Sequence, residues 1–589
     1  MNPHLVRQSQ TLAEAFRRVV ARYGDAEALI FGAERITYRQ MDARTAALAA
    51  SLHRLGVRRG DNVALILPNC PEFLYTIFAL AQIGAAAVPF SPQSGGRDME
   101  HILSYARAVA VVTDARAPGS DLVSLIAEVR PRLPALRHVI VRDAHEHEGC
   151  ISLARLLESA EAAPMPPVAG MGAASASIRI DSMPLGADAD AAPDLPPAEP
   201  PTPADRALIL YTSGTTGLPK GAVHTHRTLV ATLGMTVRMV GSLLKPSPAL
   251  ARVAWPLLRR PSKLRWFAEL GLAAVGVGQL RWLVMTPFYH VAGYFQLMLA
   301  LLGGDKMALL ERFQPDAALE LIHRERVTIL FAVPPMLVAM LSRPDCNAHT
   351  LASLALVGTG AMPVPPQLVR ELRERIGCLV VIGYGATEAS VGTATMPVDQ
   401  EDVQAETVGR PAPGVELRIV DEARQPAPPG AVGEIAVRGP GVMAGYYGNP
   451  EGASQVMDAD GWYYTGDLGL MDERGYVRVV GRAKDMIIRA GANVYPAEVE
   501  HFLLTHPQIS QVAVIGLPSP MAGGEKIRAY VVPTAGAALT VGDVVGYCWG
   551  KIAAYKVPDE VLFVTELPLT PALQKVQHFR LRQAALGEG

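Results

Sequence analysis

The sequence predicts an α/β protein with a large layered N-terminal domain and a small α+β C-terminal domain. Short apolar runs alternate with helical patterns between residues 316 and 382, which is typical of layered α/β domains. Hairpin-like strands with Pro and Gly turns follow between Glu416 and Val437, and a compact unit of strands and helices begins at Ala483. We therefore predict an N-terminal domain over residues 1–482 and a C-terminal domain over 483–589.

Each element is predicted from its own pattern. The apolar stretch 73–90 contains Gln82, Gly84 and Pro89, which suits a buried helix followed by a turn rather than a membrane span. Runs of four to eight apolar residues predict buried strands, and longer amphipathic runs predict helices. The expected strands are 207–211, 327–333, 354–358, 378–382, 511–517 and 527–532, and the expected helices are 316–324, 365–375, 497–504 and 541–552.

Two segments interrupt this pattern. Residues 160–203 are rich in Ala, Pro, Gly and Asp without a sustained period, which predicts a flexible surface excursion. Residues 245–282 carry seven basic side chains against Glu269 alone, interleaved with Trp255, Trp266 and Trp282. This basic segment suits an amphipathic helix that contacts a membrane surface. The alternative is a surface helix whose basic face is simply solvated.

Composition narrows the class of protein. The 589 residues are 50% hydrophobic and 19% charged, an ordinary globular balance, and the net charge of −2 gives no general attraction to nucleic acid. The five cysteines are scattered without metal-ligand spacing, as expected for reduced thiols, and the first 20 residues lack the apolar core of a secretory signal. We expect a cytoplasmic protein with no nucleic-acid partner and peripheral membrane contact only through 245–282. The sequence carries no signal for an oligomeric state.

The sharpest local signal is the run Tyr211–Gly221, YTSGTTGLPKG, which follows a predicted strand. Glycines allow backbone N–H groups to approach a polyphosphate, hydroxyl groups add donors, and Lys220 adds a point charge. The run is not a P-loop, because Lys220 is followed by Gly221 instead of Ser or Thr. It predicts a nucleotide phosphate site.

This run resembles the phosphate loop of the adenylate-forming superfamily, which includes acyl-CoA synthetases, adenylation domains and luciferases. The resemblance extends from about Thr37 to the C-terminal end, with seven further motifs in the order of the family. They are 286–293 (TPFYHVAG), 358–361 (GTGA), 383–388 (GYGATE), 408–411 (VGRP), 464–469 (YTGDLG), 481–485 (GRAKD) and 554–558 (AYKVP).

The resemblance implies a ligase that forms an acyl-adenylate from ATP and a carboxylic acid, and then a thioester, with ATP, Mg²⁺ and coenzyme A as cofactors. Two anions meet in the first step, so cations and oriented donors are needed more than a base. Glu388 stands where the family binds magnesium, a role that suits a carboxylate. The implied catalytic residues are Thr215, Lys220, Glu388, Lys484 and Lys575. The implied cofactor-binding residues are Thr212, Ser213, Gly214, Thr215, Thr216, Gly217, Lys220, Gly360, Ala361, Tyr384, Gly385, Thr387, Asp467, Arg482 and Gly491.

Several roles follow motif by motif. Tyr384 corresponds to the aromatic residue that stacks on adenine, opposite Gly360 and Ala361, and Asp467 corresponds to the acid that binds the ribose. Lys484 occupies the hinge about which the small domain rotates, and the turn at Gly491 would meet the pantetheine arm. His290, Gly293 and Gly385 border the acyl pocket; for His290 we expect substrate binding and gating rather than acid–base chemistry.

The C-terminal lysine departs from the family pattern. The family ends in Pro-x-Thr-x-x-Gly-Lys, whereas this chain reads LPLTPALQK, with Gln574 before Lys575 and one extra residue. Lys575 is still the candidate for the catalytic lysine, because the following residues 576–582 resemble the closing helix of the family. The departure raises the alternative of a weakened enzyme that binds nucleotide without turnover.

The substrate is predicted from the residues near the acyl motifs. Ala292, Gly293 and residues 390–392 are small or apolar and carry no charge, which argues against an amino acid, whose ammonium group would need a buried partner. A medium- or long-chain fatty acid fits best, followed by an alicyclic or aromatic acid. Coenzyme A is the expected acceptor, and the alternative is a stand-alone adenylation enzyme that loads a carrier protein; a luciferase-like oxygenase is a further alternative.

Overall fold

The computed structural model describes residues 9–117, 120–143, 145–158, 200–212, 219–243, 265, 268–269, 279–347, 349–489, 491–519, 524–570 and 575–587. Most of the predicted excursion 160–203 and most of the basic segment 245–282 lie outside the described residues. The membrane contact predicted for 245–282 therefore stays a prediction. Among the helices that the structure describes, none has both the length and the apolarity to cross a membrane.

Two large, mainly parallel sheets organise the N-terminal part of the described chain. The first has the spatial order β18 (Arg410–Pro411), β17 (Ser390–Ala394), β16 (Leu379–Ala386), β15 (Leu356–Gly360), β14 (Ile329–Phe331), β12 (Arg281–Val284), β13 (Lys306–Leu309), β1 (Glu27–Phe31) and β2 (Glu34–Thr37). The second has the order β11 (Lys220–Thr225), β10 (Arg206–Thr212), β4 (Ala86–Pro89), β3 (Asn62–Ile66), β5 (Ala110–Asp114), β8 (His138–Arg142) and β9 (Ile151–Ser152).

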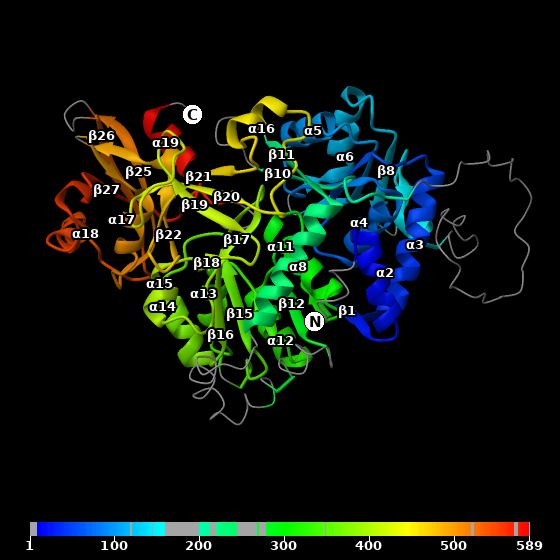
Figure 1. Ribbon diagram of the computed structural model, residues 1–589, viewed down its shortest axis with the longest axis horizontal. Coiled ribbons are helices and arrows are strands. Elements are labelled where there is room, and N and C mark those ends of the chain that lie inside the picture. The colour runs from blue at the N-terminus through cyan, green and yellow to red at the C-terminus, as the bar shows by residue number, and fades with distance from the viewer. Residues whose placement is uncertain are drawn as a thin grey trace, which may run out of the picture.

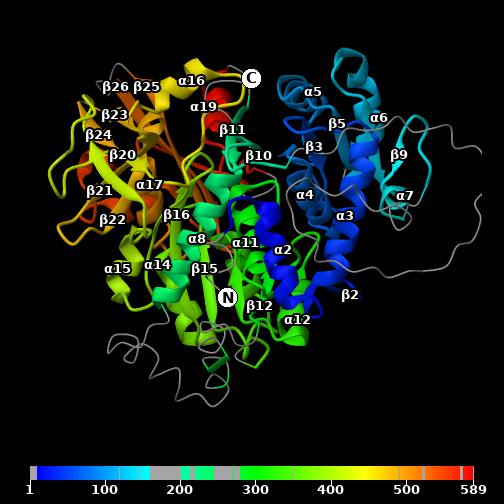
Figure 2. The ribbon, with the colours of Figure 1, turned by 45° about the vertical axis from the view of Figure 1, so that its right-hand side comes forward.

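Helices fill the space between the two sheets and cover their outer faces. The inner helices are α2 (Leu12–Tyr23), α3 (Tyr38–Arg54), α4 (Pro71–Ile83), α8 (His226–Leu243) and α11 (Val291–Leu302). Figure 2 shows α2, α8 and α11 side by side, and these three helices contact one another. The first sheet is covered by α12 (Pro315–Glu325), α13 (Pro334–Leu341) and α14 (Pro366–Glu371), and the second by α5 (Gly96–Tyr105) and α6 (Leu122–Val129).

The strands are buried on both faces, which explains their continuous apolar sequences. Along β12, Trp282 and Val284 belong to the core between the sheets, whereas Leu283 points into the core beneath α12 and α13. Successive side chains on a strand point to opposite faces, so an uninterrupted apolar run is required here. The stacked rings of Phe16 and Phe78, with centroids 4.3 Å apart, fill the inner layer.

The basic segment needs a correction at its C-terminal end. Arg281 and Trp282, which the composition of 245–282 groups with an interfacial helix, lie in β12 at the centre of the first sheet. Trp282 is buried and its Nε1 donates to Asp305 Oδ2 at 2.9 Å, while Arg281 is paired with Glu269. These residues form a strand rather than the end of a helix because β12 pairs with β13 and β14 on either side, and four residues are enough for that pairing.

A four-stranded antiparallel sheet follows, as the hairpin pattern predicts. Its strands are β19 (Glu416–Val420), β20 (Gly433–Arg438), β21 (Tyr463–Met471) and β22 (Val477–Arg482). Shorter helices lie before and within this region and near the end of the second sheet: α7 (Leu153–Glu158), α15 (Glu401–Glu406) and α16 (Pro450–Val456).

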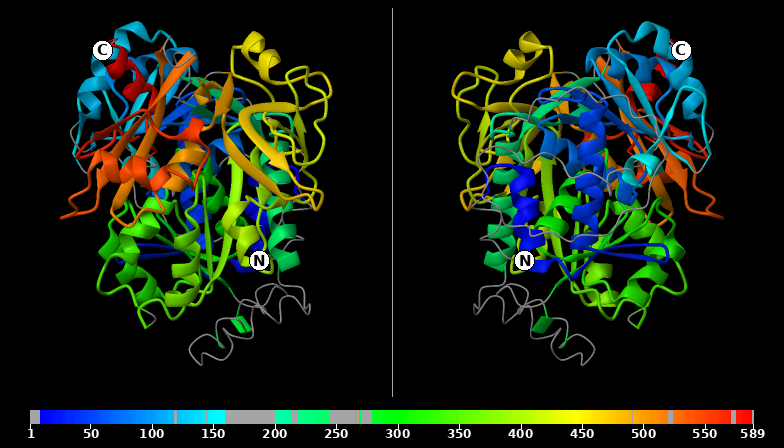
Figure 3. Two further views of the ribbon diagram at one scale, coloured as in Figure 1. Left: turned by 90° about the vertical axis from the view of Figure 1, so that its left-hand side faces the viewer. Right: turned by 90° about the vertical axis from the view of Figure 1, so that its right-hand side faces the viewer.

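The C-terminal unit has hydrophobic cores of its own. It contains β23 (Ile487–Arg489), β24 (Ala492–Val494), α17 (Pro496–Leu503), β25 (Ile509–Ser519), β26 (Gly524–Pro533), α18 (Val541–Cys548), β27 (Glu560–Phe563) and α19 (His578–Leu586). Figure 1 shows these orange and red elements gathered on the side opposite α2, α3 and α4, and Figure 3 shows them as a separate group. A short turn, Ala483–Asp485, separates β22 from β23, and we propose the domain boundary there.

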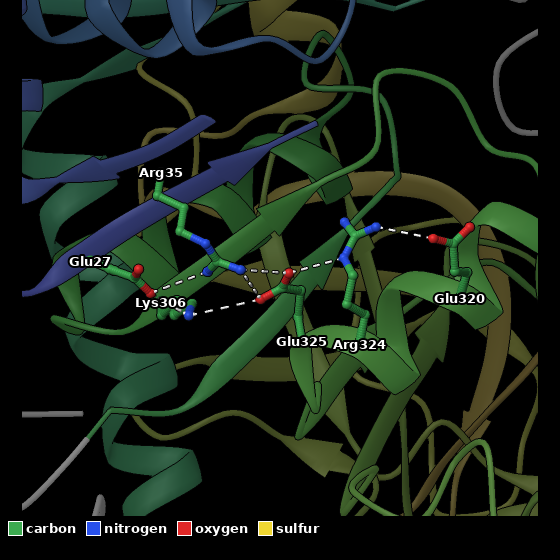
Figure 4. Close-up of polar contacts among 6 residues, drawn as sticks. All are labelled: Glu27, Arg35, Lys306, Glu320, Arg324 and Glu325. Atoms are coloured by element: carbon green, nitrogen blue, oxygen red, sulfur yellow. Dashed lines mark hydrogen bonds and ion pairs between the residues drawn. The ribbon is translucent and has the colours of Figure 1, made fainter. Parts of the chain in front are cut away.

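An ion-pair cluster fixes the N-terminal hairpin to the first sheet (Figure 4). Glu325 at the end of α12 is almost fully buried, and its carboxylate accepts from Arg35 Nη2 at 3.0 and 3.2 Å and from Arg324 Nε at 3.1 Å. Lys306 of β13 lies 3.9 Å from Glu325 and also pairs with Glu27 of β1. One buried carboxylate thus connects three cations from β2, β13 and α12.

We expect Glu325→Gln to lower the free energy of unfolding by about 2 kcal/mol, because charged hydrogen bonds to a buried group are lost and three cations are left close together. Urea unfolding of the two proteins measures the difference. Glu320→Gln is the matched control: Glu320 also pairs with Arg324 but is exposed, so its effect should stay within about 0.5 kcal/mol. Equal effects of the two substitutions would contradict the role of Glu325.

Candidate active site

One end of the candidate site is built around Asp467 on β21. In the antiparallel register, Asp467 lies opposite Arg482 at the end of β22, and Arg482 Nε donates to Asp467 Oδ1 at 2.8 Å. The hydroxyl of Tyr384 on β16 donates to the other carboxylate oxygen at 2.8 Å. Burial and the neighbouring Asp467 raise the pKa of Tyr384, so the phenol keeps its proton. Asp467 is thus a buried acceptor at the meeting point of two sheets.

The backbone beside Tyr384 is shaped by close approaches that only glycine permits. Gly360, the last residue of β15, has φ +153°, and a Cβ there would lie 2.2 Å from the carbonyl oxygen of Gly383. A Cβ on Gly385 would lie 1.9 Å from the carbonyl oxygen of Ser390. Ala361 and Ser390 have φ of 64° and 57°, a conformation that is uncommon outside glycine and is found at functional sites. The strand ends therefore form a flat, side-chain-free wall.

Glu388 lies two residues before β17 and is buried. Its Oε1 accepts from the hydroxyl of Tyr446 at 2.9 Å, and the ammonium group of Lys220 lies 5.3 Å from the centre of the same tyrosine ring. Behind it, His224 of β11 lies with Nε2 2.8 Å from the carbonyl oxygen of Thr387. A carbonyl only accepts, so Nε2 carries the proton and donates. Glu388 is thereby positioned from two sides, by Tyr446 from the segment between β20 and α16 and by β11 of the second sheet through Thr387.

The environment of Glu388 fits a divalent cation. Among the described residues, no Lys or Arg lies within ion-pair distance of its carboxylate. A buried carboxylate without a cation partner is costly, and a hard oxygen ligand that shares Mg²⁺ with phosphate groups resolves that cost. The described residues contain no group of three or more His, Cys, Asp or Glu side chains that could hold a metal ion.

Lys575 reaches the site from the C-terminal unit. It is partly buried close to His290, Arg482 and Asp467, and burial together with the charge of Arg482 lowers its pKa, against the influence of Asp467. Its position is fixed by a short ladder, in which Lys575 N donates to Thr570 Oγ1 at 3.0 Å and Thr570 N donates to Lys575 O at 2.7 Å. Residues 569 and 576 also pair, so two successive pairs hold Lys575 beside Thr570.

Three histidines near or behind this site have strongly lowered pKa values. Burial lowers the pKa of His224, His226 and His290 to about 4, and the charge of Lys575 contributes at His290. These imidazoles are neutral in the folded protein at neutral pH, whereas the unfolded chain protonates them near pH 6.5. A neutral imidazole with a pKa of about 4 is poorly suited to acid–base catalysis at neutral pH, so for His290 the lowered pKa agrees with a role in binding.

The folded protein should therefore lose stability as the pH falls from 6.5 toward 4, and should keep this contribution above pH 6.5. For the fully buried His224 and His226 the loss is about 1.4 kcal/mol per histidine for each pH unit in this window. Thermal unfolding at pH 7.5, 6.5, 5.5 and 5.0 measures it before most carboxylates titrate. His226→Gln should flatten the pH dependence, while His145→Gln, at an exposed position, should not. A midpoint independent of pH between 6.5 and 5.0 would contradict the assignment.

Comparison with known proteins identifies this arrangement. The model of the AMP-binding enzyme family matches residues 16–447, and the model of the AMP-binding enzyme C-terminal domain matches residues 498–572. The chain belongs to the AMP-binding enzyme family. Its fold class, its class of enzyme and its predicted cofactors ATP, Mg²⁺ and coenzyme A are confirmed at the level of this family.

Relatives of this AMP-binding enzyme are CoA ligases. It is 34% identical to feruloyl-CoA synthase of Amycolatopsis sp over 92% of this chain and 93% of that protein. It is 30% identical to the human mitochondrial medium-chain acyl-CoA ligase ACSF2 over 98% of this chain and 87% of that protein. Among solved structures, it resembles the anthranilate CoA ligase AuaEII in complex with anthranoyl-AMP, with a TM-score of 0.79, 25% identity and coverage of 100% and 99% of the two chains.

The structure of this AMP-binding enzyme brings many of the predicted residues together. Described residues gathered at the site are Thr212, Lys220, His290, Gly360, Ala361, Tyr384, Gly385, Thr387, Glu388, Asp467, Arg482 and Lys575. Five predicted residues of the phosphate loop, Ser213, Gly214, Thr215, Thr216 and Gly217, lie outside the described residues.

Three predicted residues have a different setting. Lys484 is exposed in the turn between β22 and β23, and Gly491 lies in the turn between β23 and β24, facing open space. Gly293 is buried in the first turn of α11, where a Cβ would lie 2.2 Å from the carbonyl oxygen of Pro287. This close packing is reason enough for a glycine there, and a substrate contact stays a prediction.

Two residues beside Glu388 are absent from the sequence-based predictions. Tyr446 is separated from Glu388 by 58 residues and His224 from Thr387 by 163. A signal for His224 is present in the sequence, because a histidine within a buried strand requires a hydrogen-bond partner. No comparable signal connects Tyr446 to the site.

Proposed function

We propose that this enzyme is an ATP-dependent CoA ligase for an apolar carboxylic acid, which it activates as an acyl-adenylate. The observation that carries this proposal is that Lys575 lies near Asp467, and that Asp467 and Glu388 both lie near Tyr463, although the three come from separate parts of the chain. The residues supply a cation, a metal ligand and a hydroxyl acceptor. These are the groups needed to bring a carboxylate to the α-phosphate of ATP.

In the first step, the residues of the chain act by position and charge. Asp467 accepts from the ribose hydroxyl groups, and the wall at Gly360 and Ala361 faces the adenine opposite Tyr384. Glu388 would hold Mg²⁺, which would supply positive charge to neutralise the phosphates. The charges of Lys575 and Asp467 act on each other, and that of Lys575 acts on His290, so we propose that its ammonium group contacts both the acid and the α-phosphate. We assign Lys575 as the residue whose positive charge promotes the adenylation step.

In the second step, the thiol of coenzyme A attacks the acyl-adenylate and releases AMP. Lys575 has to leave the site for the thiol to enter, since the lysine lies beside the acyl group whose carbonyl carbon the thiol attacks. The separate cores of the C-terminal unit and the exposed turn Ala483–Asp485 support a rotation of that unit about Lys484. The turn at Gly491 would then face the pantetheine arm.

The second part of the proposal concerns the class of carboxylic acid that is the substrate. The fatty acid predicted from the sequence and the aromatic acid that was its alternative both have support among relatives, a medium-chain acyl-CoA ligase and a feruloyl-CoA synthase. The cavity beside the site is lined mainly by Leu, Val, Phe and Met side chains, which supports an apolar acid of either kind. We propose an apolar acid and leave the choice between these two classes to the experiment.

The test is pyrophosphate release from ATP and Mg²⁺ across a panel of fatty, aromatic and alicyclic acids, with and without coenzyme A. We expect release to accelerate with coenzyme A and to yield an acyl-CoA for one class of acid. Release without a thioester product would favour the loading of a carrier protein. Failure of every acid to release pyrophosphate would overturn the ligase.

A further inference from the structure

A second feature of the molecule is a cavity between the two large sheets, next to the active site. It is a narrow space of about 10 Å³, and it lies between α8 and α11, beneath strands β10 and β11. Most of its lining is apolar, with Leu208, Leu210, Leu229, Leu233, Phe295 and Met298. Val291 and Ser390 also line it, and they follow His290 and Glu388 closely in the chain. The cavity thus begins where the carboxylate of the acid is placed by the proposed function.

Two polar atoms in this apolar lining have no hydrogen-bond partner. They are Nδ1 of His224 and the hydroxyl of Tyr294, and both side chains are at most 3% exposed. A buried polar group without a partner costs about 1–3 kcal/mol. Two residues that carry such a group line this one cavity.

The chemistry of the two atoms is defined. Because His224 donates through Nε2 to the carbonyl of Thr387, its Nδ1 carries a lone pair and can only accept. Burial lowers the pKa of His224 to about 4 and raises that of Tyr294, so both stay neutral. The hydroxyl of Tyr294 can donate and accept. A single hydroxyl group placed between them would donate to His224 and accept from Tyr294.

The other hydroxyl groups in the lining are already bonded. Thr232 Oγ1 donates to the carbonyl of Thr228 at 2.8 Å, and Ser390 Oγ donates to the carbonyl of Gly441 at 3.3 Å. Among the described residues that line the cavity, only His224 and Tyr294 therefore have a side-chain polar atom without a hydrogen-bond partner.

We propose that this cavity selects carboxylic acids whose apolar body carries a hydroxyl group away from the carboxylate, bound between His224 and Tyr294. The inference rests on the proposed ligase function and names a substrate class for it. An acid without that hydroxyl would leave both atoms unpaired, and discrimination of this kind is stronger than that of an apolar pocket against a missing methylene group.

The size of the cavity agrees with a single oxygen atom at this point. Side chains constrict the space so that only about 10 Å³ is open to the centre of a water molecule, which corresponds to about one water. A hydroxyl group of the acid is the same size and would take the place of that water. The flexible side chain of Met298 is suited to moving aside for the apolar body.

The experiment measures binding of two matched pairs of acids to the full-length enzyme by calorimetry. The pairs are 3-(4-hydroxyphenyl)propanoic and 3-phenylpropanoic acid, and 12-hydroxydodecanoic and dodecanoic acid. The quantity of interest is the affinity ratio of hydroxy acid to parent acid in the wild type, divided by the same ratio in Tyr294→Phe. This comparison removes the difference in hydrophobicity between the two acids. We expect a value of about ten or more for at least one pair.

The Tyr294→Phe variant is chosen because the hydroxyl that it removes makes no hydrogen bond in the protein, so the fold should be retained. Thr232→Val is the matched control, since it removes a hydroxyl of the same cavity that is already bonded, and its ratio should equal that of the wild type. A value near one for both pairs would overturn the inference. Binding is measured without turnover, so failure of the ligase activity would be seen separately, in pyrophosphate release.

Discussion

Lys575→Ala is expected to reduce acid-dependent pyrophosphate release about 100- to 1,000-fold. Removal of one preorganised group that stabilises developing charge has an effect of this size, and the ammonium group of Lys575 is close to both Asp467 and His290. Thioester formation from a supplied acyl-adenylate should fall much less, because two anions no longer have to meet. Rapid-quench assays of the two half-reactions measure the two effects.

The control for this variant is Lys551→Ala. Lys551 is also in the C-terminal unit but is exposed, over the ring of Tyr547, and its substitution should leave both half-reactions unchanged. If Lys575→Ala slowed the two half-reactions equally, the lysine would be needed for the fold or the motion of the unit and not for adenylation. Full activity of Lys575→Ala would refute its catalytic assignment.

Glu388→Gln is expected to lower kcat/KM for pyrophosphate release about 1,000-fold and to raise the Mg²⁺ concentration needed for half-maximal rate. The amide oxygen can still accept from Tyr446, so the local structure is retained while the negative charge that binds the cation is lost. A shift in the Mg²⁺ dependence is a response that a purely structural role would not produce.

Tyr446→Phe separates the two roles of this carboxylate. It removes the hydrogen bond to Glu388 and keeps the charge, so the rate should fall less than tenfold and the Mg²⁺ dependence should stay near that of the wild type. An unchanged Mg²⁺ dependence in Glu388→Gln would contradict the assignment of the metal ligand.

The parts of the site that are local in sequence could be predicted from the sequence. Gly360 and Gly385 stand where a Cβ would collide with the neighbouring strand, and Asp467 and Arg482 occupy facing positions of one hairpin. Such constraints act within a few residues or between adjacent strands, so they leave a compact pattern. The alternation of strands and helices was visible for the same reason, since burial on both faces demands apolar runs.

Contacts between distant segments could not be predicted in this way. The partners of Glu388 and Thr387 come from Tyr446 and His224, and nothing in the local pattern selects these two from the other tyrosines and histidines. The departure before Lys575 looked like a defect in the motif. The pairing of Lys575 with Thr570 is a contact that this altered motif did not indicate.

The basic segment illustrates a limit of composition. Seven cations and several tryptophans predict an interfacial helix, but charge counts do not locate the end of a segment. Trp282 belongs to a strand of four residues, too short to leave a period, and its burial depends on β13 and β14 on either side. The tertiary environment decides such short elements.

The position of α11 has a consequence for how substrate preference can change. From Gln296 to Leu302 this helix is buried throughout, and Tyr294 is buried as well. Tyr294 and Met298 line the cavity and also belong to the core between the two sheets. Any substitution that reshapes the cavity from α11 also disturbs the packing of the core, with a typical cost of 2–5 kcal/mol for a large-to-small change. Leu229 and Leu233 on α8 line the same cavity and belong to the same core, so evolution and protein engineering should reach new acids most readily after stabilising changes elsewhere.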